Sequence, residues 1–396
     1  MQNNTLSLKT GVVGLLGAAT MGTVMLSPAM TLYGNFGPTY SAAGKAAPLV
    51  FILALLATIP TAISYALMAR DYPESGSAQA WTTRAVSKNA GQWTGWMVFL
   101  YYFTAFVMQP VTLGLFFNDV LTALHIPTGF WTYLIGAVGC SILPARLVFK
   151  GINPSTNGAL MFLLVEAAVV GALCLMVSIF NPTPSESLSL SGFMFSSASE
   201  GTHGIFKGMV FAMLSFTGFD VISTLSEETH MPKRLIPQAT FLSIIMFGLF
   251  VITGVWALTY ATSPENLRAL ANSSGMPITE IARMYWGKGS ILIAITGLSA
   301  GLGIAIATSV GASRVLFSMG RNGQAPKFLA KLNPATQVPS SALALIFAAG
   351  LGGAILVGGM TSPYMAYVWW GTTTLFFAMI TYIAVNTSNL ILNRRK

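Results

Sequence analysis

The chain has 396 residues, of which 54% are hydrophobic and only 8% are charged. Ordinary soluble domains contain about 25% charged residues, so this composition excludes a soluble enzyme. The net charge of +9 would suggest a nucleic-acid partner in a soluble protein, but here the basic residues form short clusters between apolar stretches. That distribution is typical of cytoplasmic loops, so we predict an all-α integral membrane protein with no nucleic-acid partner.

Ten apolar stretches are long enough to cross a bilayer, which requires about 20 apolar residues per helix. In chain order they are residues 11–34, 46–69, 92–122, 130–149, 157–180, 205–229, 237–261, 288–317, 340–358 and 363–388. The connections between them are short, so residues 1–396 are predicted to form a single transmembrane domain. The loops near 181–204 and 262–287 are rich in Ser and Asn, and we expect short helices in them at the external mouth.

The basic residues are unequally divided between the two sides of the predicted membrane. Fifteen Lys and Arg residues lie on the side of the termini, and the other five are Lys45, Lys207, Arg268, Arg283 and Lys288. Because positively charged loops stay in the cytoplasm, both termini are predicted to be cytoplasmic in a prokaryotic-type plasma membrane.

Two of the predicted spans contain residues that interrupt helices. The first has Gly17, Gly22 and Pro28, which predict a break between residues 20 and 30, and the sixth has SFTGFD with Gly218 near its centre. Breaks five spans apart are typical of transporters built from two inverted five-helix repeats, with the substrate at the membrane midplane. The repeats are expected at about 11–180 and 205–388. For any single glycine, close helix packing is the alternative.

Two carboxyl groups lie inside predicted spans, Glu166 in the fifth and Asp220 in the sixth. An ionisable group in the membrane costs roughly 2.5–3.5 kcal/mol on insertion scales, so each requires a reason. Burial favours the neutral acid, as a group that loads and releases a proton requires, and both are candidate proton-coupling residues. The alternative is that each carboxyl caps or cross-links a broken helix.

Broken helices expose backbone N–H and C=O groups that suit a carboxylate and an ammonium, so the predicted substrate is a small amino acid or amine. The candidate binding residues are Thr20, Met21, Gly22, Thr23, Ser27, Tyr101, Tyr102, Ser215, Phe216 and Gly218. The two tyrosines have an alternative role as interfacial anchors. Thr308 and Ser309 are candidate sodium ligands, unless their hydroxyls bond to their own helix. No catalytic residue, cofactor or other metal site is expected.

Several segments resemble the amino acid–polyamine–organocation permeases. FTGFDVISTLSEETHMPKRLIPQA (216–239) resembles the sixth-helix signature of that family, ASRVLFSMGRNGQAPKFLAKLNPATQVPS (312–340) resembles the segment after its eighth helix, and ATMGT (19–23) resembles its first-helix break. The resemblance implies a five-plus-five inverted repeat, substrate carboxylate binding by the backbone around Thr20–Thr23, and a coupling role for Asp220. It also implies that Glu227 and Glu228 are structural residues paired with Lys233 or Arg234.

Within that family, TAISYALMARDYPESGSA (61–78) and GFDVISTLSEET (218–229) are similar to putrescine-importer-like permeases. Three positions depart from the pattern. Tyr101 stands where the diamine importers have an acid, Glu166 where related permeases have Gln or Lys, and Leu214 at an aromatic gate position. Many family members have twelve helices, whereas the ten spans predicted here make up the complete core repeat.

The predicted function is a secondary active transporter that imports or exchanges its substrate by alternating access, coupled to protons. The alternatives are a channel or uncoupled facilitator for small amines, and a sodium-coupled symporter. The expected partners are the substrate, protons and membrane lipid, and the chain is expected to be a monomer or a weak homodimer.

Overall fold

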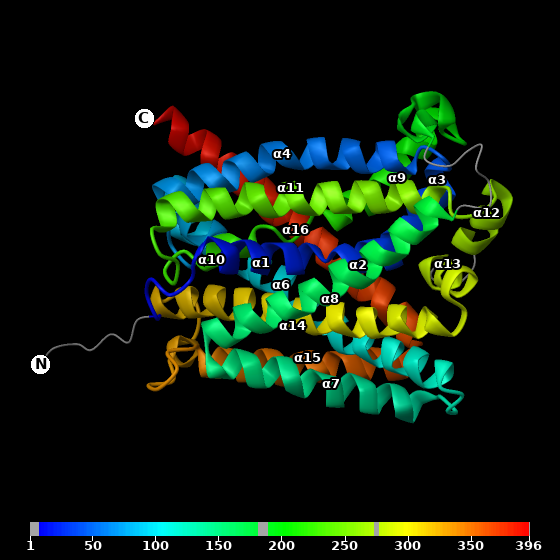
Figure 1. Cartoon of the computed structure of the whole chain (residues 1–396). Coiled ribbons are helices and arrows are strands. Elements are labelled where there is room, and N and C mark those ends of the chain that lie inside the picture. Colours follow the sequence, from blue (N-terminus) through cyan, green and yellow to red (C-terminus); the bar gives the residue numbers. More distant parts are fainter. Residues whose placement is uncertain (1–7, 181–188, 273–276, 396) are drawn as a thin grey trace, which may run out of the picture.

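The computed structural model describes residues 8–180, 189–272 and 277–395. In this part of the chain the fold is almost entirely helical, with two isolated backbone bridges, Val13 with Thr229 and Gly44 with Ala198, and no strand. The first described residues and the end of the last helix lie at the same end of the bundle (Figure 1), which we call the termini end.

Nine helical stretches of the described residues are long and apolar enough to cross a membrane. They are α1 to α3 (Leu15–Leu26, Pro28–Met30, then the π-helix η1 Thr31–Asn35 and Phe36–Ala43), α4 (Ala47–Asp71), α6 (Lys88–Ala123), α7 (Phe130–Lys150), α8 (Ile152–Ile179), α11 (Pro232–Thr259), α13 to α14 (Pro277–Trp286, η4 Gly287–Ser290 and Ile291–Arg321), α15 (Ser340–Met360) and α16 (Pro363–Arg394).

The predicted sixth span is divided into two helices, α9 (Gly201–Ser215) and α10 (Val221–Thr224). Every predicted span therefore has a helical counterpart. The other short helices are α5 (Ala78–Ala85), η2 (Leu190–Phe193), η3 (Phe195–Ser197), α12 (Pro264–Asn272) and η5 (Lys327–Ala330). Short helices are thus present in both predicted external loops, although residues 181–188 and 273–276 of those loops lie outside the described ranges.

The starts of several helices follow from local sequence. Ser87 and Ser362 are the N-cap residues of α6 and α16, and their hydroxyls accept from the N–H groups of Ala90 and Met365, both at 3.2 Å. Helix α11 begins at Pro232, whose missing N–H is not needed in the first turn of a helix. In all three cases the helix begins where a polar loop ends and an apolar stretch begins.

Helix α14 lies inside the bundle, packed against α1, α6, α7, α8 and α15. The first span is also central, with 83% of its most apolar window buried, whereas the corresponding value for α8 is 28%. The outer helices expose large apolar side chains, including Trp131, Leu175 and Phe376 at 73%, 66% and 61%. Such surfaces are stable only in hydrocarbon, so the chain is a multi-pass membrane protein.

Close packing of α6 against α7 depends on Gly114. A Cβ at this position would lie 2.7 Å from the backbone oxygen of Tyr133, which can give way only if the backbone of α7 shifts. We expect Gly114→Ala to destabilise the folded protein by about 1–3 kcal/mol through overpacking, measured as a lower melting temperature in detergent.

The matched control for this prediction is Gly139→Ala on α7, where a Cβ has no neighbour within 4 Å. Alanine favours a helix over glycine by about 1 kcal/mol, so the control should leave stability unchanged or raise it. Equal effects of the two substitutions would contradict the packing argument.

Candidate functional site

The first span is interrupted at Ser27, between α1 and α2. Ser27 has φ 47° and ψ 95°, which is not helical, because the residue before a proline is disfavoured in helical backbone and Pro28 has no N–H to continue the helix. After three residues of α2 the chain enters η1, which is π-helical. Segments of this kind are rare and frequently lie at functional sites. The predicted break is therefore present.

The break does not lie at Thr20–Thr23, as the family resemblance implied. These residues are inside the continuous helix α1, which uses their N–H groups, and the Thr23 hydroxyl donates to the Ala19 carbonyl at 2.9 Å. Gly22 serves packing instead, because a Cβ there would lie 2.8 Å from Cγ1 of Ile222 in α10. The prediction that free backbone groups at Thr20–Thr23 bind a substrate is therefore corrected, because the helix is not interrupted there. Pro28, and not a glycine, sets the position of the break.

Glu166 reaches the first break from α8. Its Oε2 accepts a hydrogen bond from the Ser27 hydroxyl at 3.2 Å and another from the N–H of Ala29 at 3.3 Å, and the residue is fully buried. A carboxylate at this point stabilises the free N–H groups that the interruption leaves at the start of α2. The sequence contained no local partner for Glu166, and folding supplies one 139 residues away.

The second break covers residues 216–220, between α9 and α10. Gly218 has φ 127°, a conformation that other residues rarely adopt. A Cβ on Gly218 would lie 2.8 Å from Cγ of Met25 and 3.1 Å from its carbonyl carbon, so the two interrupted spans are in contact at this glycine. The N–H of Gly218 donates to the hydroxyl of Tyr382 in α16 at 3.2 Å.

Asp220 is surrounded by three tyrosine hydroxyls. Tyr101 and Tyr382 donate to Oδ1 at 3.2 and 2.7 Å, and Tyr102 donates to Oδ2 at 2.5 Å. The carboxyl is only 1% exposed, and O–H donors of this kind compensate a carboxylate for the loss of water. The sequence analysis missed Tyr382, because a single tyrosine in an apolar helix cannot be distinguished by sequence from one that anchors the helix at the membrane interface.

A cavity of about 320 Å³ lies where the two breaks meet, between the first span, α6, α9, α14 and α16. Much of its wall is apolar and includes Met25, Met30, Met108, Leu214 and Ile304. The polar residues that line it include Ser27, Thr31, Asn35, Tyr101, Gln109, Ser215, Thr217 and Thr308. A pocket with apolar walls and a few convergent polar groups is typical of small-molecule sites.

The structure brings only part of the predicted site to this cavity. Ser27, Tyr101 and Ser215 line it. The residues that do not line it are Thr20, Met21, Gly22, Thr23, Tyr102, Phe216 and Gly218. Phe216, for example, packs edge-on against Phe247 with ring centroids 5.2 Å apart. The sequence analysis missed Asn35, whose amide donates to the Ser215 hydroxyl at 2.8 Å and so links η1 to α9.

The two candidate sodium ligands bond to their own helix. The Thr308 hydroxyl donates to the Ile304 carbonyl at 2.7 Å, and the Ser309 hydroxyl donates to the Ala305 carbonyl at 2.6 Å. This is the alternative arrangement for hydroxyls in membrane helices. Thr308 also lines the cavity.

At the termini end, a buried ion pair joins the loop after α10 to α14. Arg314 and Glu228 form two parallel hydrogen bonds of 2.9 and 3.1 Å, and their side chains are 1% and 2% exposed. The carbonyl of Glu228 also accepts from the N–H groups of Val12 and Val13, both at 2.9 Å, which holds the start of the first span. We predicted that Glu227 and Glu228 pair with Lys233 or Arg234. This prediction is corrected, because both partners are arginines of α14, Arg321 for Glu227 and Arg314 for Glu228.

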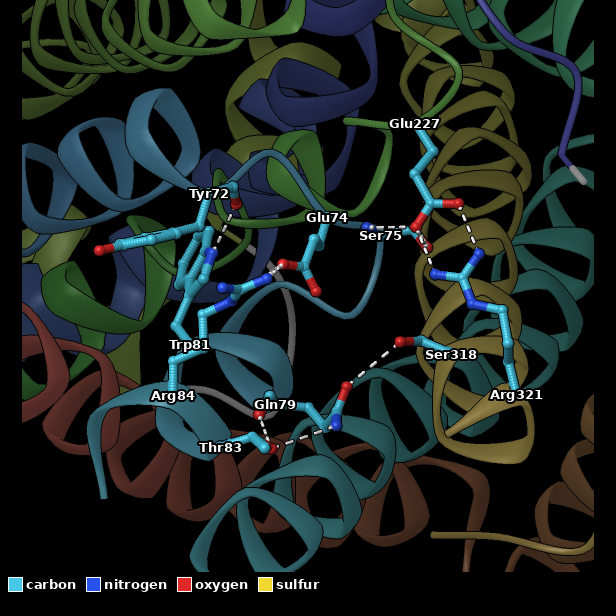
Figure 2. Close-up of polar contacts among 10 residues, drawn as sticks. All are labelled: Tyr72, Glu74, Ser75, Gln79, Trp81, Thr83, Arg84, Glu227, Ser318 and Arg321. Carbon is cyan, nitrogen blue, oxygen red and sulfur yellow. Dashed lines mark hydrogen bonds and ion pairs between the residues drawn. The ribbon is translucent and has the colours of Figure 1, made fainter. Parts of the chain in front are cut away.

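A second layer of polar contacts, drawn in Figure 2, joins Glu227, the chain neighbour of Glu228, to Arg321 and Ser75. Glu227 receives hydrogen bonds from Arg321 at 2.6 and 2.9 Å and from the Ser75 hydroxyl at 2.8 Å. Gln79 accepts from Ser318 at 3.2 Å and also bonds Gln324. These contacts connect α5 and the segment before it to the end of α14.

Burial by itself would raise the pKa of the Glu227 carboxyl, but the hydrogen bonds from Arg321 and Ser75 together with the Arg321 charge lower it below the ordinary value of 4.5. Glu227 is therefore charged in the folded protein at neutral pH. The ion pair of Glu227 with Arg321 in Figure 2 depends on that charge.

Interrupted spans that meet at a small cavity are typical of membrane transporters. Residues 17–396 match the amino acid permease family, and the chain belongs to that family. It is 27% identical to the low-affinity putrescine importer PlaP of Escherichia coli K12 over 345 residues, which cover 85% of this chain and 73% of PlaP. Members of this family are permeases, so the chain is a transporter and not an enzyme.

Two further relatives show the range of molecules that similar proteins carry. The branched-chain amino acid permease BcaP of Bacillus subtilis 168 is 26% identical over 313 residues, covering 75% of this chain and 64% of BcaP. The methylthioribose transporter of the same organism is 26% identical over 331 residues, covering 80% of this chain and 69% of that protein.

The buried pair generates a prediction on stability. We expect Arg314→Met to destabilise the protein by about 3–5 kcal/mol, because it leaves the Glu228 charge buried and unpaired. Arg84→Met, which removes the exposed partner of Glu74, is the control and should cost at most about 1 kcal/mol. Melting temperatures in detergent measure both, and similar effects of the two variants would contradict the assignment.

The lowered pKa of Glu227 generates a prediction on pH dependence. Because this pKa lies below 4.5 in the folded state, the stabilisation by Glu227 is complete above 4.5 and is lost as the pH falls through the folded value. We expect Glu227→Gln to melt below the wild type at about pH 6, with the difference decreasing as the pH falls below the ordinary pKa of a glutamate. A difference that grows at low pH would contradict this prediction, and Glu265→Gln, at an exposed position of α12, is the control.

Proposed function

We propose that this permease is a secondary active transporter that imports or exchanges a small amino acid or amine by alternating access, coupled to protons. The observation that carries the proposal is the position of two buried carboxyls, each one hydroxyl away from the cavity. Ser27 lines the cavity and donates to Glu166, and Tyr101 lines the cavity and donates to Asp220. A change of protonation at either carboxyl therefore alters a group in the cavity wall.

The two carboxyls support coupling in different ways. The Glu166 carboxylate stabilises the start of α2, and protonation removes the charge that interacts with those N–H groups. Asp220 holds α6 and α16 through the three tyrosines, so protonation weakens a connection between helices. Each proton thus favours a different arrangement of the interrupted spans, which is what coupling between a proton and a conformational change requires.

The charge distribution supports an orientation with both termini in the cytoplasm. In this orientation the layer of Figure 2 and the pair of Arg314 with Glu228 close the cytoplasmic side. The cavity wall includes Asn35, Pro38 and Val210. These residues belong to η1, α3 and α9, the parts of the first and sixth spans that are farther from the termini end. This arrangement corresponds to an outward-facing state, and release into the cytoplasm requires the contacts of Glu227 and Glu228 to open.

Residues 1–396 would then act as one domain, with two inverted repeats at about 11–180 and 205–388 that move around the cavity. The relatives are named as carriers of putrescine and of branched-chain amino acids, which supports an amino acid or an amine as the substrate. The mainly apolar cavity is large enough for solutes of this size.

Transport by purified protein in liposomes tests the proposal. With one coupled proton, an inward gradient of about one pH unit supports about tenfold accumulation, because 1.4 kcal/mol corresponds to a factor of ten. We expect gradient-driven uptake of a labelled amino acid that a protonophore abolishes. Glu166→Gln and Asp220→Asn should lose the dependence on the gradient, while Glu265→Gln at an exposed position of α12 should retain it.

The same experiment distinguishes the alternatives. Uptake that depends on a sodium gradient at constant pH favours a sodium symporter, and unsaturable flux without counterflow favours a channel or uncoupled facilitator. Wild-type uptake that ignores the pH gradient, together with unchanged uptake by both carboxyl variants, would overturn proton coupling.

A further inference from the structure

The described residues that line the cavity include no Asp, Glu, Lys, Arg or His. The two nearby carboxyls lie behind the wall, and their hydrogen bonds are made to protein groups. Both oxygens of Asp220 accept from tyrosine hydroxyls, and Oε2 of Glu166 accepts from Ser27 and Ala29. Oε1 of Glu166 is buried without a partner, but Glu166 is not among the residues that line the cavity. A cation in the cavity therefore meets no side chain that carries a negative charge.

One polar group in the wall has an unused acceptor. Gln109 lies on α6 and is 1% exposed, and its Nε2 donates to the Ala105 carbonyl one turn earlier at 2.8 Å. Its Oε1 is buried without any hydrogen-bond partner. Buried side-chain acceptors are nearly always satisfied, so an unsatisfied one in a cavity wall indicates a donor that arrives with the ligand.

The remainder of the wall determines what else the ligand carries. Met25, Met30, Met108, Leu214 and Ile304 surround a volume of about 320 Å³. Methionine side chains are flexible and adapt to apolar groups of different shape. The cavity thus suits a solute with one nitrogen donor and an apolar side chain.

We propose that Gln109 determines substrate specificity: it accepts a hydrogen bond from the ammonium of a zwitterionic amino acid with an apolar side chain, and the permease rejects diamines. This inference rests on the proposed transport function and names its substrate class. A zwitterion carries its own counter-charge, whereas a diamine would place two positive charges in a cavity whose described lining has no charged side chain, and a buried charge requires a partner. In this respect the chain differs from its relative PlaP, which is named as a putrescine importer.

Counterflow in proteoliposomes loaded with L-leucine tests the inference, with labelled L-leucine outside and unlabelled putrescine as a competitor. Wild-type exchange should saturate with L-leucine and resist a large excess of putrescine. Gln109→Leu removes the acceptor at similar size and should raise the KM for L-leucine about tenfold or more, as expected for a lost hydrogen bond to a charged donor. Gln109→Glu supplies a carboxylate and should make putrescine an effective competitor.

Thr112→Val is the matched control, because Thr112 is a buried residue of the same helix that does not line the cavity and its hydroxyl bonds to the Met108 carbonyl. Its KM should equal that of the wild type, and melting temperatures verify that all variants are folded. Putrescine exchange by the wild type, or an unchanged KM for folded Gln109→Leu, would overturn the role of Gln109. Neither result would contradict the proposed transport function. Folded wild-type protein that exchanges neither solute, nor any other amino acid or amine, would overturn the transport function itself.

Discussion

The constraint on which this structure depends is that a helix interrupted inside a bilayer has no water to satisfy its free backbone groups. Both interruptions are satisfied by side chains from distant spans. Glu166 accepts from Ala29 at the first break, and Tyr382 accepts from Gly218 at the second. The two breaks also contact each other, at Gly218 and Met25. The cavity lies where the two interrupted spans meet, and at each break a side chain from a distant span accepts from a freed N–H group.

The two buried carboxyls combine the roles that the sequence presented as alternatives. Glu166 caps a broken helix, and Asp220 cross-links α6 and α16 through tyrosine hydroxyls. A structural role of this kind is also what proton coupling requires, since a proton changes the conformation only by changing a contact that differs between states. Capping and coupling are therefore compatible proposals for the same residue.

The molecule is asymmetric along the direction of its spans. The termini end is held by ion pairs of α14 with Glu227 and Glu228, whereas the cavity lies towards the opposite end and is lined by apolar and uncharged polar groups. In the proposed mechanism these ion pairs must separate before the solute leaves on that side, and the more exposed pair of Arg321 with Glu227 has water nearby to replace its contacts. An apolar wall suits a site that takes up a solute from water and releases it again, because binding there is weak for any group without a matched partner.

Composition and hydropathy by themselves determined the membrane, the ten spans and the presence of two interruptions, because a bilayer requires long apolar helices and Pro28 and Gly218 act on their own backbone. Family-specific segments identified the class of protein. Only the tertiary structure decided that Glu166 reaches the first break, that Glu228 pairs with Arg314, and that Tyr382 bonds Asp220 while Gln109 lines the cavity. These contacts depend on which faces of distant helices meet, and the hydrophobic pattern within a single span does not determine its neighbours.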